Sequence, residues 1–178
     1  AELMRKEGYN PLSGCLPMLL TWPLMIAMFA AMRAIANEQL VMQVFRYLAG
    51  EENVLSSADR FLWVKNIWMT DSPFTSIAPD ASALQVITQD VWQKAYDLLS
   101  DSQRGAILQN LAGQTLDFST ADAMKASVSA IMGALQNLPA YTQTLEVVPG
   151  WSGLNFFLFS ITLYKQFNGL LIFPILAG

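Results

Sequence analysis

The sequence predicts an all-α membrane protein with one complete transmembrane helix, a helical insert and the start of a second transmembrane helix. No charged residue occurs across residues 8–32, and a bilayer core of roughly 30 Å needs about 20 mainly apolar helical residues to cross it. Apolar residues then recur three and four positions apart within residues 84–138, which is typical of amphipathic helices. Residues 169–178 are again uncharged, but this run is too short to cross a bilayer unaided.

The composition limits the function classes. The 178 residues are 53% hydrophobic and 13% charged, whereas soluble domains average roughly 25% charged. A net charge of −4 argues against direct nucleic-acid binding, which needs a basic face. The chain has no histidine and one cysteine, so it lacks the usual general base and cannot form an intrachain disulfide. We therefore expect no enzyme activity, no cofactor and no metal. The first residue, Ala1, and the apolar C-terminus suggest a piece of a longer protein.

The predicted transmembrane helix covers residues 10–35. Asn10 can cap its first turn, and Pro11 suits that turn because its missing N–H would lack a partner there. Inside a helix in water, Pro17 and Pro23 would each cost ~3 kcal/mol or more. In lipid they are tolerated where neighbours such as the Thr21 hydroxyl satisfy the freed carbonyls. We expect a kinked helix with one side facing protein or water.

Residues 36–74 are predicted to form a helix and then an interfacial aromatic segment. Helical spacing of apolar residues within 40–48 ends near Gly50. This helix either continues the membrane helix or lies on the membrane surface. Aromatic rings with a polar edge prefer the headgroup level. The predicted interfacial anchor consists of Phe61, Trp63 and Trp68.

Residues 75–150 are predicted to form a water-facing helical insert with three apolar stripes. The first stripe comprises Leu84, Ile87, Val91, Ala95 and Leu98. The second comprises Ile107, Leu108 and Leu111, and it ends at Gly113. The third helix begins with Ser119 and Asp122 in a capping-box arrangement, and Pro139 ends it. Residues 151–168 resemble a second interfacial aromatic segment, and 169–178 the start of the next transmembrane helix.

Several motifs resemble the YidC/Oxa/Alb family of membrane protein insertases. The run KEGYNPLSGCLP covers residues 6–17, and Pro23-Leu24 follows it. The run FLW at 61–63 is followed by Asp71 and Pro73, and FPILAG closes the chain at 173–178.

The resemblance implies a multi-pass protein of the bacterial plasma membrane. Residues 1–9 would end a cytoplasmic helical hairpin, and residues 36–168 would be extracytoplasmic. Charge alone does not choose this orientation, because Lys and Arg tie across the span. The family implies a hydrophilic groove, open to cytoplasm and lipid, that receives nascent membrane proteins. The implied partners are these clients, the lipid bilayer, the ribosome and the Sec translocon. The implied function is insertion and chaperoning of integral membrane proteins.

Two features depart from the family pattern. The groove arginine of the family lies on a helix before residue 1, and Arg33 is not its equivalent because it sits at the far end of the span. The insert at 75–165 is larger than the short loop typical of the family, so its role does not carry over.

We expect six residues to line the substrate path: Cys15, Pro17, Thr21, Trp22, Pro23 and Met25. Each also has a purely structural interpretation. Cys15 can be a small packed side chain, since burial raises the pKa of a thiol and makes it inert. Thr21 and Trp22 can support the kink. The stripe of Met18, Met25, Met28 and Met32 can contact lipid or a packed helix, or offer an adaptable surface to varied client helices.

Two other functions fit the sequence less well. A transporter or channel subunit could use a kinked pathway-lining helix, but it would be expected to show paired half-spans with polar residues at mid-membrane. A soluble helical domain could bury one very apolar helix in its core.

Overall fold

The computed structural model describes residues 11–156 and 159–177, and it divides the chain into two compact units, Ala1–Ala36 and Asn37–Gly178. Helix α2 (Pro11–Leu48) begins in the first unit and continues into the second. The predictions for residues 1–9 and Asn10 lie outside the described residues.

Helix α2 is a single helix of 38 residues, so residues 37–48 continue the predicted membrane helix. At about 1.5 Å per residue it is about 57 Å long, well beyond a hydrocarbon core of roughly 30 Å. Its C-terminus lies at Leu48, just before Gly50, the residue predicted to stop the helix. The N–H of Ala49 donates to the carbonyl of Phe45 at 2.8 Å, and that of Gly50 to the carbonyl of Tyr47 at 3.0 Å. Gly50 adopts φ +79°, a conformation typical of the residue that stops a helix.

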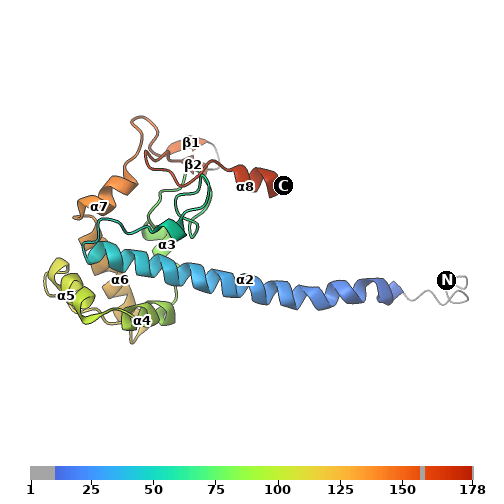
Figure 1. Cartoon of the computed structure of the whole chain (residues 1–178), viewed down its shortest axis with the longest axis horizontal. Coiled ribbons are helices and arrows are strands. Elements are labelled where there is room, and N and C mark those ends of the chain that lie inside the picture. Colours follow the sequence, from blue (N-terminus) through green and yellow to red (C-terminus); the bar gives the residue numbers. More distant parts are fainter. Residues whose placement is uncertain (1–10, 157–158, 178) are drawn as a thin grey trace, which may run out of the picture. The chain divides into compact units, whose positions relative to one another are not determined.

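The core of the second unit forms around the last three turns of α2. Helices α4 (Gln89–Asp97), α5 (Asp101–Asn110) and α6 (Ala121–Leu135) gather beside this part of α2 (Figure 1). Phe45 of α2 meets Trp92 edge-on, with ring centroids 5.8 Å apart, and Trp92 stacks on Phe118 at 5.7 Å. All three side chains are fully or almost fully buried. Such aromatic pairs contribute ~0.5–1.5 kcal/mol beyond their buried area.

The first predicted stripe of the insert is divided between two helices. Helices α3 (Ala81–Gln85) and α4 are separate, and each has its own N-cap residue: Asp80 for α3 and Thr88 for α4. Leu84, Ile87 and Ala95 are buried as the stripe requires, but Leu98 is 61% exposed. The prediction was wrong at Leu98 because the chain turns between the two helices, so a single helical period does not run through both.

The predicted start of the third insert helix was wrong by one residue. Thr120, not Ser119, caps α6, because its hydroxyl accepts from the N–H of Ala123 at 3.2 Å. The Ser119 N–H instead donates to the Asp117 carboxylate at 2.8 Å. A capping box that was not predicted starts α5, where Ser100 and Gln103 bond reciprocally.

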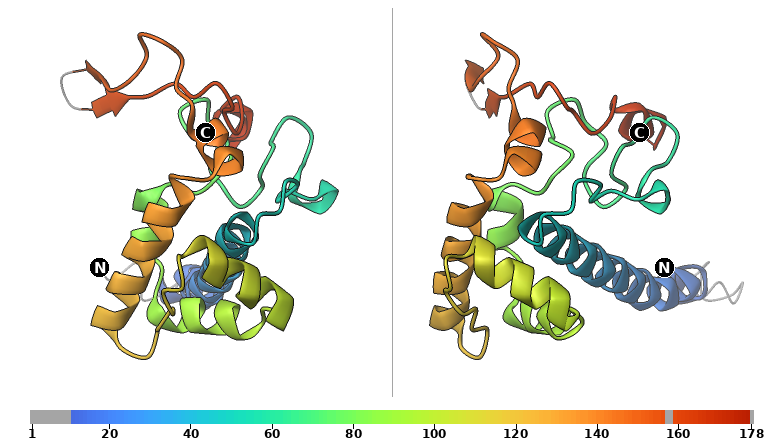
Figure 2. Two further views of the ribbon diagram at one scale, coloured as in Figure 1. Left: turned by 90° about the vertical axis from the view of Figure 1, so that its left-hand side faces the viewer. Right: turned by 60° about the vertical axis from the view of Figure 1, so that its left-hand side comes forward.

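The remaining elements are short. They are the 3-10 turns η1 (Ser57–Asp59) and η2 (Gln143–Leu145), α7 (Pro139–Thr142), the strands β1 (Leu154–Phe156) and β2 (Phe159–Ile161), and α8 (Ile172–Ala177). The strands form an antiparallel hairpin in which Leu154 pairs with Ile161. The sequence did not predict this hairpin, but the described fold is otherwise helical, as predicted. Residues 59–71 and 165–171, far apart in the sequence, lie side by side in the second unit (Figure 2).

Candidate functional site

The most unusual surface among the described residues is the apolar part of α2 from Thr21 to Ile35. Eight large apolar side chains there are between 47% and 71% exposed: Trp22, Leu24, Met25, Ile26, Met28, Phe29, Met32 and Ile35. Leu24, Met25 and Ile26 are consecutive, and each step along a helix turns by about 100°. The apolar surface therefore surrounds the helix, which is typical of a membrane span rather than of a helix with one buried face.

The charges on α2 agree with a membrane span. Thr21–Leu48 is long and apolar enough to cross a membrane by length and composition. Arg33 is the first charged residue in the described part of the helix, and Glu38 is the next. A charge at the centre of a bilayer costs at least ~2.5 kcal/mol on insertion scales. The charge-free part of α2 therefore ends at Arg33. The same exposure argues against the soluble alternative, in which this segment would be buried.

The predicted substrate-path residues all lie on α2. Thr21, Trp22, Pro23 and Met25 have exposed side chains, whereas the side chains of Cys15 and Pro17 lie outside the described part of the structure. With 3.6 residues per turn, Met25, Met28 and Met32 share one face with Thr21. Unbranched, polarizable methionine side chains can adapt to varied partners. Whether this face meets clients or lipid stays a prediction.

Near the other end of the described chain, the carboxylate of Asp71 bonds the residues before α8, an arrangement that we call the carboxylate clasp. Asp71 accepts the N–H groups of Leu170 at 2.8 Å and Leu171 at 3.3 Å, directly before α8. It also accepts the indole N–H of Trp63 at 3.4 Å. A Cβ atom at Gly169 would collide with the Asp71 carboxylate, so the clasp requires glycine there. The clasp therefore joins the FLW segment to the start of α8.

A buried amide network reinforces the same connection. Asn66 donates to the side-chain oxygen of Gln43 and to the carbonyl of Ile77, both at 2.8 Å. The side-chain oxygen of Asn168 accepts the N–H of Asn66 at 2.7 Å, and its amide donates to the carbonyls of Asn66 and Thr70. All three amide side chains are buried, and buried polar groups of this kind stabilise a fold only when satisfied. The network ties the end of α2 to the segment before α8.

Sequence patterns did not predict this network. Only Gln43 carries a local signal, because it is a polar residue between Met42 and Val44. Asn66 follows Lys65, and Asn168 lies in the polar run that begins at Lys165, so neither stands out in the sequence.

The predicted interfacial anchor divides into two kinds of residue. Phe61 is 55% exposed, whereas Trp63 and Trp68 are half-buried and bond carboxylates through their indole N–H groups. The Trp68 indole donates to Asp59 at 2.8 Å, and the Ser56 hydroxyl and N–H donate to the same carboxylate at 2.8 Å. Burial alone would raise the pKa of Asp59, but these hydrogen bonds and the Arg46 charge together lower it.

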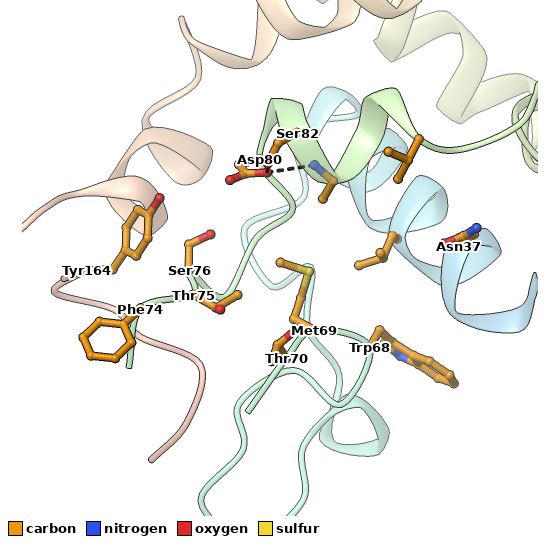
Figure 3. Close-up of a pocket in the computed structure, with 13 residues that line it drawn as sticks. Asn37, Trp68, Met69, Thr70, Phe74, Thr75, Ser76, Asp80, Ser82 and Tyr164 are labelled. Atoms are coloured by element: carbon orange, nitrogen blue, oxygen red, sulfur yellow. Dashed lines mark hydrogen bonds between the residues drawn. The ribbon is translucent and has the colours of Figure 1, made fainter. Parts of the chain in front are cut away.

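A cavity of about 420 Å³ opens between the end of α2, α3 and residues 68–76. Asn37 and Trp68 lie on one side of it and Tyr164 and Phe74 on the other, with Met69 between them (Figure 3). Its carboxylate, Asp80, accepts the Ala83 N–H at 2.9 Å and the Ser82 hydroxyl at 2.7 Å, so it caps α3. The described residues contain no cluster of three or more His, Cys, Asp or Glu that could hold a metal ion.

The chain matches the 60Kd inner membrane protein family over residues 1–171. It belongs to this family. No curated protein and no solved structure matches the chain. The family is one of membrane insertases and not a known enzyme class, so membership supports a general role in inserting membrane proteins and a membrane location.

Family membership also bears on the insert and on the transporter alternative. The match runs through residues 75–150, so the helical insert lies within the family region. The resemblance seen in the sequence rested on shorter segments at 1–35, 61–74 and 169–178, and the family match confirms it. In the described part of the chain, no observation favours a solute pathway.

Proposed function

We propose that this chain is part of a plasma-membrane insertase that inserts and helps fold nascent integral membrane proteins, alone or with the Sec translocon. The main support for this proposal is the run of exposed apolar side chains on α2, in which Met25, Met28 and Met32 share one face with Thr21. A client helix needs a surface that accepts many sequences, and flexible methionine side chains suit that requirement.

The proposed path uses Cys15, Pro17, Thr21, Trp22, Pro23 and Met25. Pro17 and Pro23 each leave a helix carbonyl without its usual donor. Carbonyls and hydroxyls within the bilayer lower the cost of bringing a client's polar groups into hydrocarbon. The apolar part of the client then partitions sideways into lipid. In this proposal, residues 1–9 are cytoplasmic, on the side of the ribosome, residues 10–35 span the membrane, and residues 36–168 are extracytoplasmic in a multi-pass protein.

Site-specific photo-crosslinking tests this assignment. Crosslinkers replace Trp22, Met25 and, as a matched control, Leu24, which is equally apolar and 71% exposed. On an ideal helix, Leu24 points about 160° away from Trp22 and about 100° away from Met25. We expect Trp22 and Met25 to capture a stalled nascent transmembrane segment and Leu24 to capture mainly lipid. Capture of lipid alone at both Trp22 and Met25 would remove these residues from the path.

A further inference from the structure

The turn at residues 60–67 has a surface that neither the fold nor the proposed substrate path uses. Two backbone hydrogen bonds close it, from Phe61 to Val64 at 3.0 Å and back at 2.8 Å. At its tip, Leu62 is 74% exposed and adopts φ +51°, a left-handed conformation that leucine rarely takes. Ile67 is also exposed. The turn therefore holds large apolar side chains out of the core of the second unit.

A hollow of about 510 Å³ lies beside this tip. Its walls are mainly apolar, and they include Phe61, Val64, Ile67 and Met69. Arg60 and Asp71 supply the charged lining. The hollow thus has mainly apolar walls with one base and one acid in its lining, and the Asp71 carboxylate already accepts the N–H groups of Leu170 and Leu171.

The local charge of the turn is opposite to that of the unit around it. Residues 37–178 carry twelve acidic and seven basic residues, but residues 60–70 carry Arg60 and Lys65 and no acid. Both bases are on exposed residues, and the Lys65 ammonium lies 4.9 Å from the centre of the Phe167 ring. Basic side chains next to exposed apolar ones favour an anionic, partly apolar surface.

The turn is also hydrogen-bonded to the residue that precedes the uncharged run at residues 169–178. The Lys65 N–H donates to the carbonyl of Asn168 at 3.1 Å. Asp71, which lines the hollow, holds the N–H groups of Leu170 and Leu171. Beyond them, Ile175 and Leu176 of α8 are exposed and apolar. If α8 begins the next transmembrane helix, as the resemblance implies, the turn lies at the edge of the bilayer.

We propose that the turn at residues 60–67 docks on the phospholipid bilayer beside α8. Leu62, Phe61 and Ile67 enter the boundary between headgroups and acyl chains, and Arg60 and Lys65 are attracted to the net negative charge of anionic headgroups. This anchor shares Phe61 with the one predicted from sequence; the other two predicted residues, Trp63 and Trp68, donate their indole N–H groups to Asp71 and Asp59. The inference goes beyond the proposed function and does not depend on the substrate path.

Fluorescence quenching in the full chain tests the proposal. The single native cysteine is replaced (Cys15→Ser), and an environment-sensitive fluorophore is attached to Leu62→Cys, Ile67→Cys or the control Leu98→Cys. Leu98 is 61% exposed in the same unit, on the insert. The protein is reconstituted in vesicles of phosphatidylcholine with phosphatidylglycerol. We expect lipid-borne nitroxide near the headgroups to quench positions 62 and 67 at least about twofold more than position 98, with aqueous iodide showing the opposite order.

The outcomes separate the bilayer from other occupants. Equal quenching at 62, 67 and 98 would overturn the proposal. Protection of 62 and 67 from both quenchers would also overturn it, because a protein surface, such as a second copy, would then cover the turn. As a second measurement, Arg60→Gln with Lys65→Gln should weaken lipid quenching at 62 by about twofold in vesicles containing phosphatidylglycerol and leave it unchanged in pure phosphatidylcholine. Lys125→Gln, on exposed residue Lys125 of α6, is the control and should change neither value. The same loss in both lipids would mean that the net negative charge of the lipid plays no part and would overturn the role of the two bases.

Discussion

Two parts of helix α2 are similar in sequence character but differ in their surroundings. Apart from Thr21 and Arg33, residues 21–35 are apolar on all sides of the helix and exposed, whereas the apolar residues within 40–48 are buried in the core of the second unit. Leu40, Val41 and Val44 would suit lipid as well as Met28 and Phe29 do. The difference lies in the polar positions. Gln43 and Arg46 occur among the buried residues, and each has a partner in the second unit: Asn66 and the carbonyl of Val54.

Hydropathy alone therefore does not separate an exposed apolar helix from one covered by protein. Arg33 and Glu38 separate the two parts, and beyond them the helix has protein neighbours instead of an exposed apolar surface. Four substitutions test whether the surroundings of the two parts differ in this way.

The largest expected effect is in the buried part. Phe45→Ala would remove a ring that meets Trp92, Tyr96 and Phe118, and we expect a loss of about 3–5 kcal/mol in the free energy of unfolding. The matched variant in the exposed part is Phe29→Ala, which should change the free energy of unfolding by less than about 0.5 kcal/mol. Denaturant unfolding of the detergent-solubilised chain measures both. Equal effects would mean that the two parts have the same surroundings.

A charge should have its main effect in the exposed part. Phe29→Asp would place a carboxylate in the span, at an expected cost of about 2.5–3.5 kcal/mol for membrane insertion. Resistance to carbonate extraction measures it. The control is Leu98→Asp on the insert, which should leave extraction unchanged. Full retention of the Phe29→Asp protein in membranes would contradict the lipid-facing assignment.

A methyl group at the clasp tests how the second unit holds the start of α8. Gly169→Ala would push a Cβ atom against the Asp71 carboxylate, and we expect about 1–3 kcal/mol of destabilisation. Gly133→Ala is the control because a Cβ there meets nothing within 4 Å, and it should stabilise α6 by roughly 0.5–1 kcal/mol. Thermal unfolding separates them, since the two substitutions should shift the midpoint in opposite directions.

The smallest expected effect is a pH dependence at Asp59, next to the buried part of α2. Its pKa in the folded protein is lowered, so the folded state favours the carboxylate more than the unfolded state does. The resulting stability is complete above the unfolded pKa, and it is lost as the pH falls below that value towards the folded one. Asp59→Asn should therefore reduce stability at neutral pH and flatten the decline that sets in as the pH falls through and below 3.8, the ordinary value for aspartate. An acid decline as steep as in the unmodified chain would show that Asp59 does not contribute to it.

Local patterns predicted much of the helical architecture. The charge-free run indicated the exposed part of α2, and Gly50 was correctly predicted to stop the helix, because hydropathy and helix termination depend on neighbouring residues. The same reasoning failed where two candidate caps were adjacent, as at Ser119 and Thr120. It also failed at Leu98, because a turn of three residues changed the helical phase. The substrate-path residues were proposed from a resemblance, and their role stays a prediction.

The family, the helical class and the apolar segment of α2 each follow from residues close together in the chain, so sequence patterns predict them. Three features became visible only in the folded chain: α2 continues into a protein core, Asn66 and Asn168 bond to each other although the insert separates them in the sequence, and Trp63 and Trp68 donate to carboxylates. Asn66 and Asn168 are 102 residues apart, and no local pattern specifies which distant polar groups will satisfy one another once water is excluded.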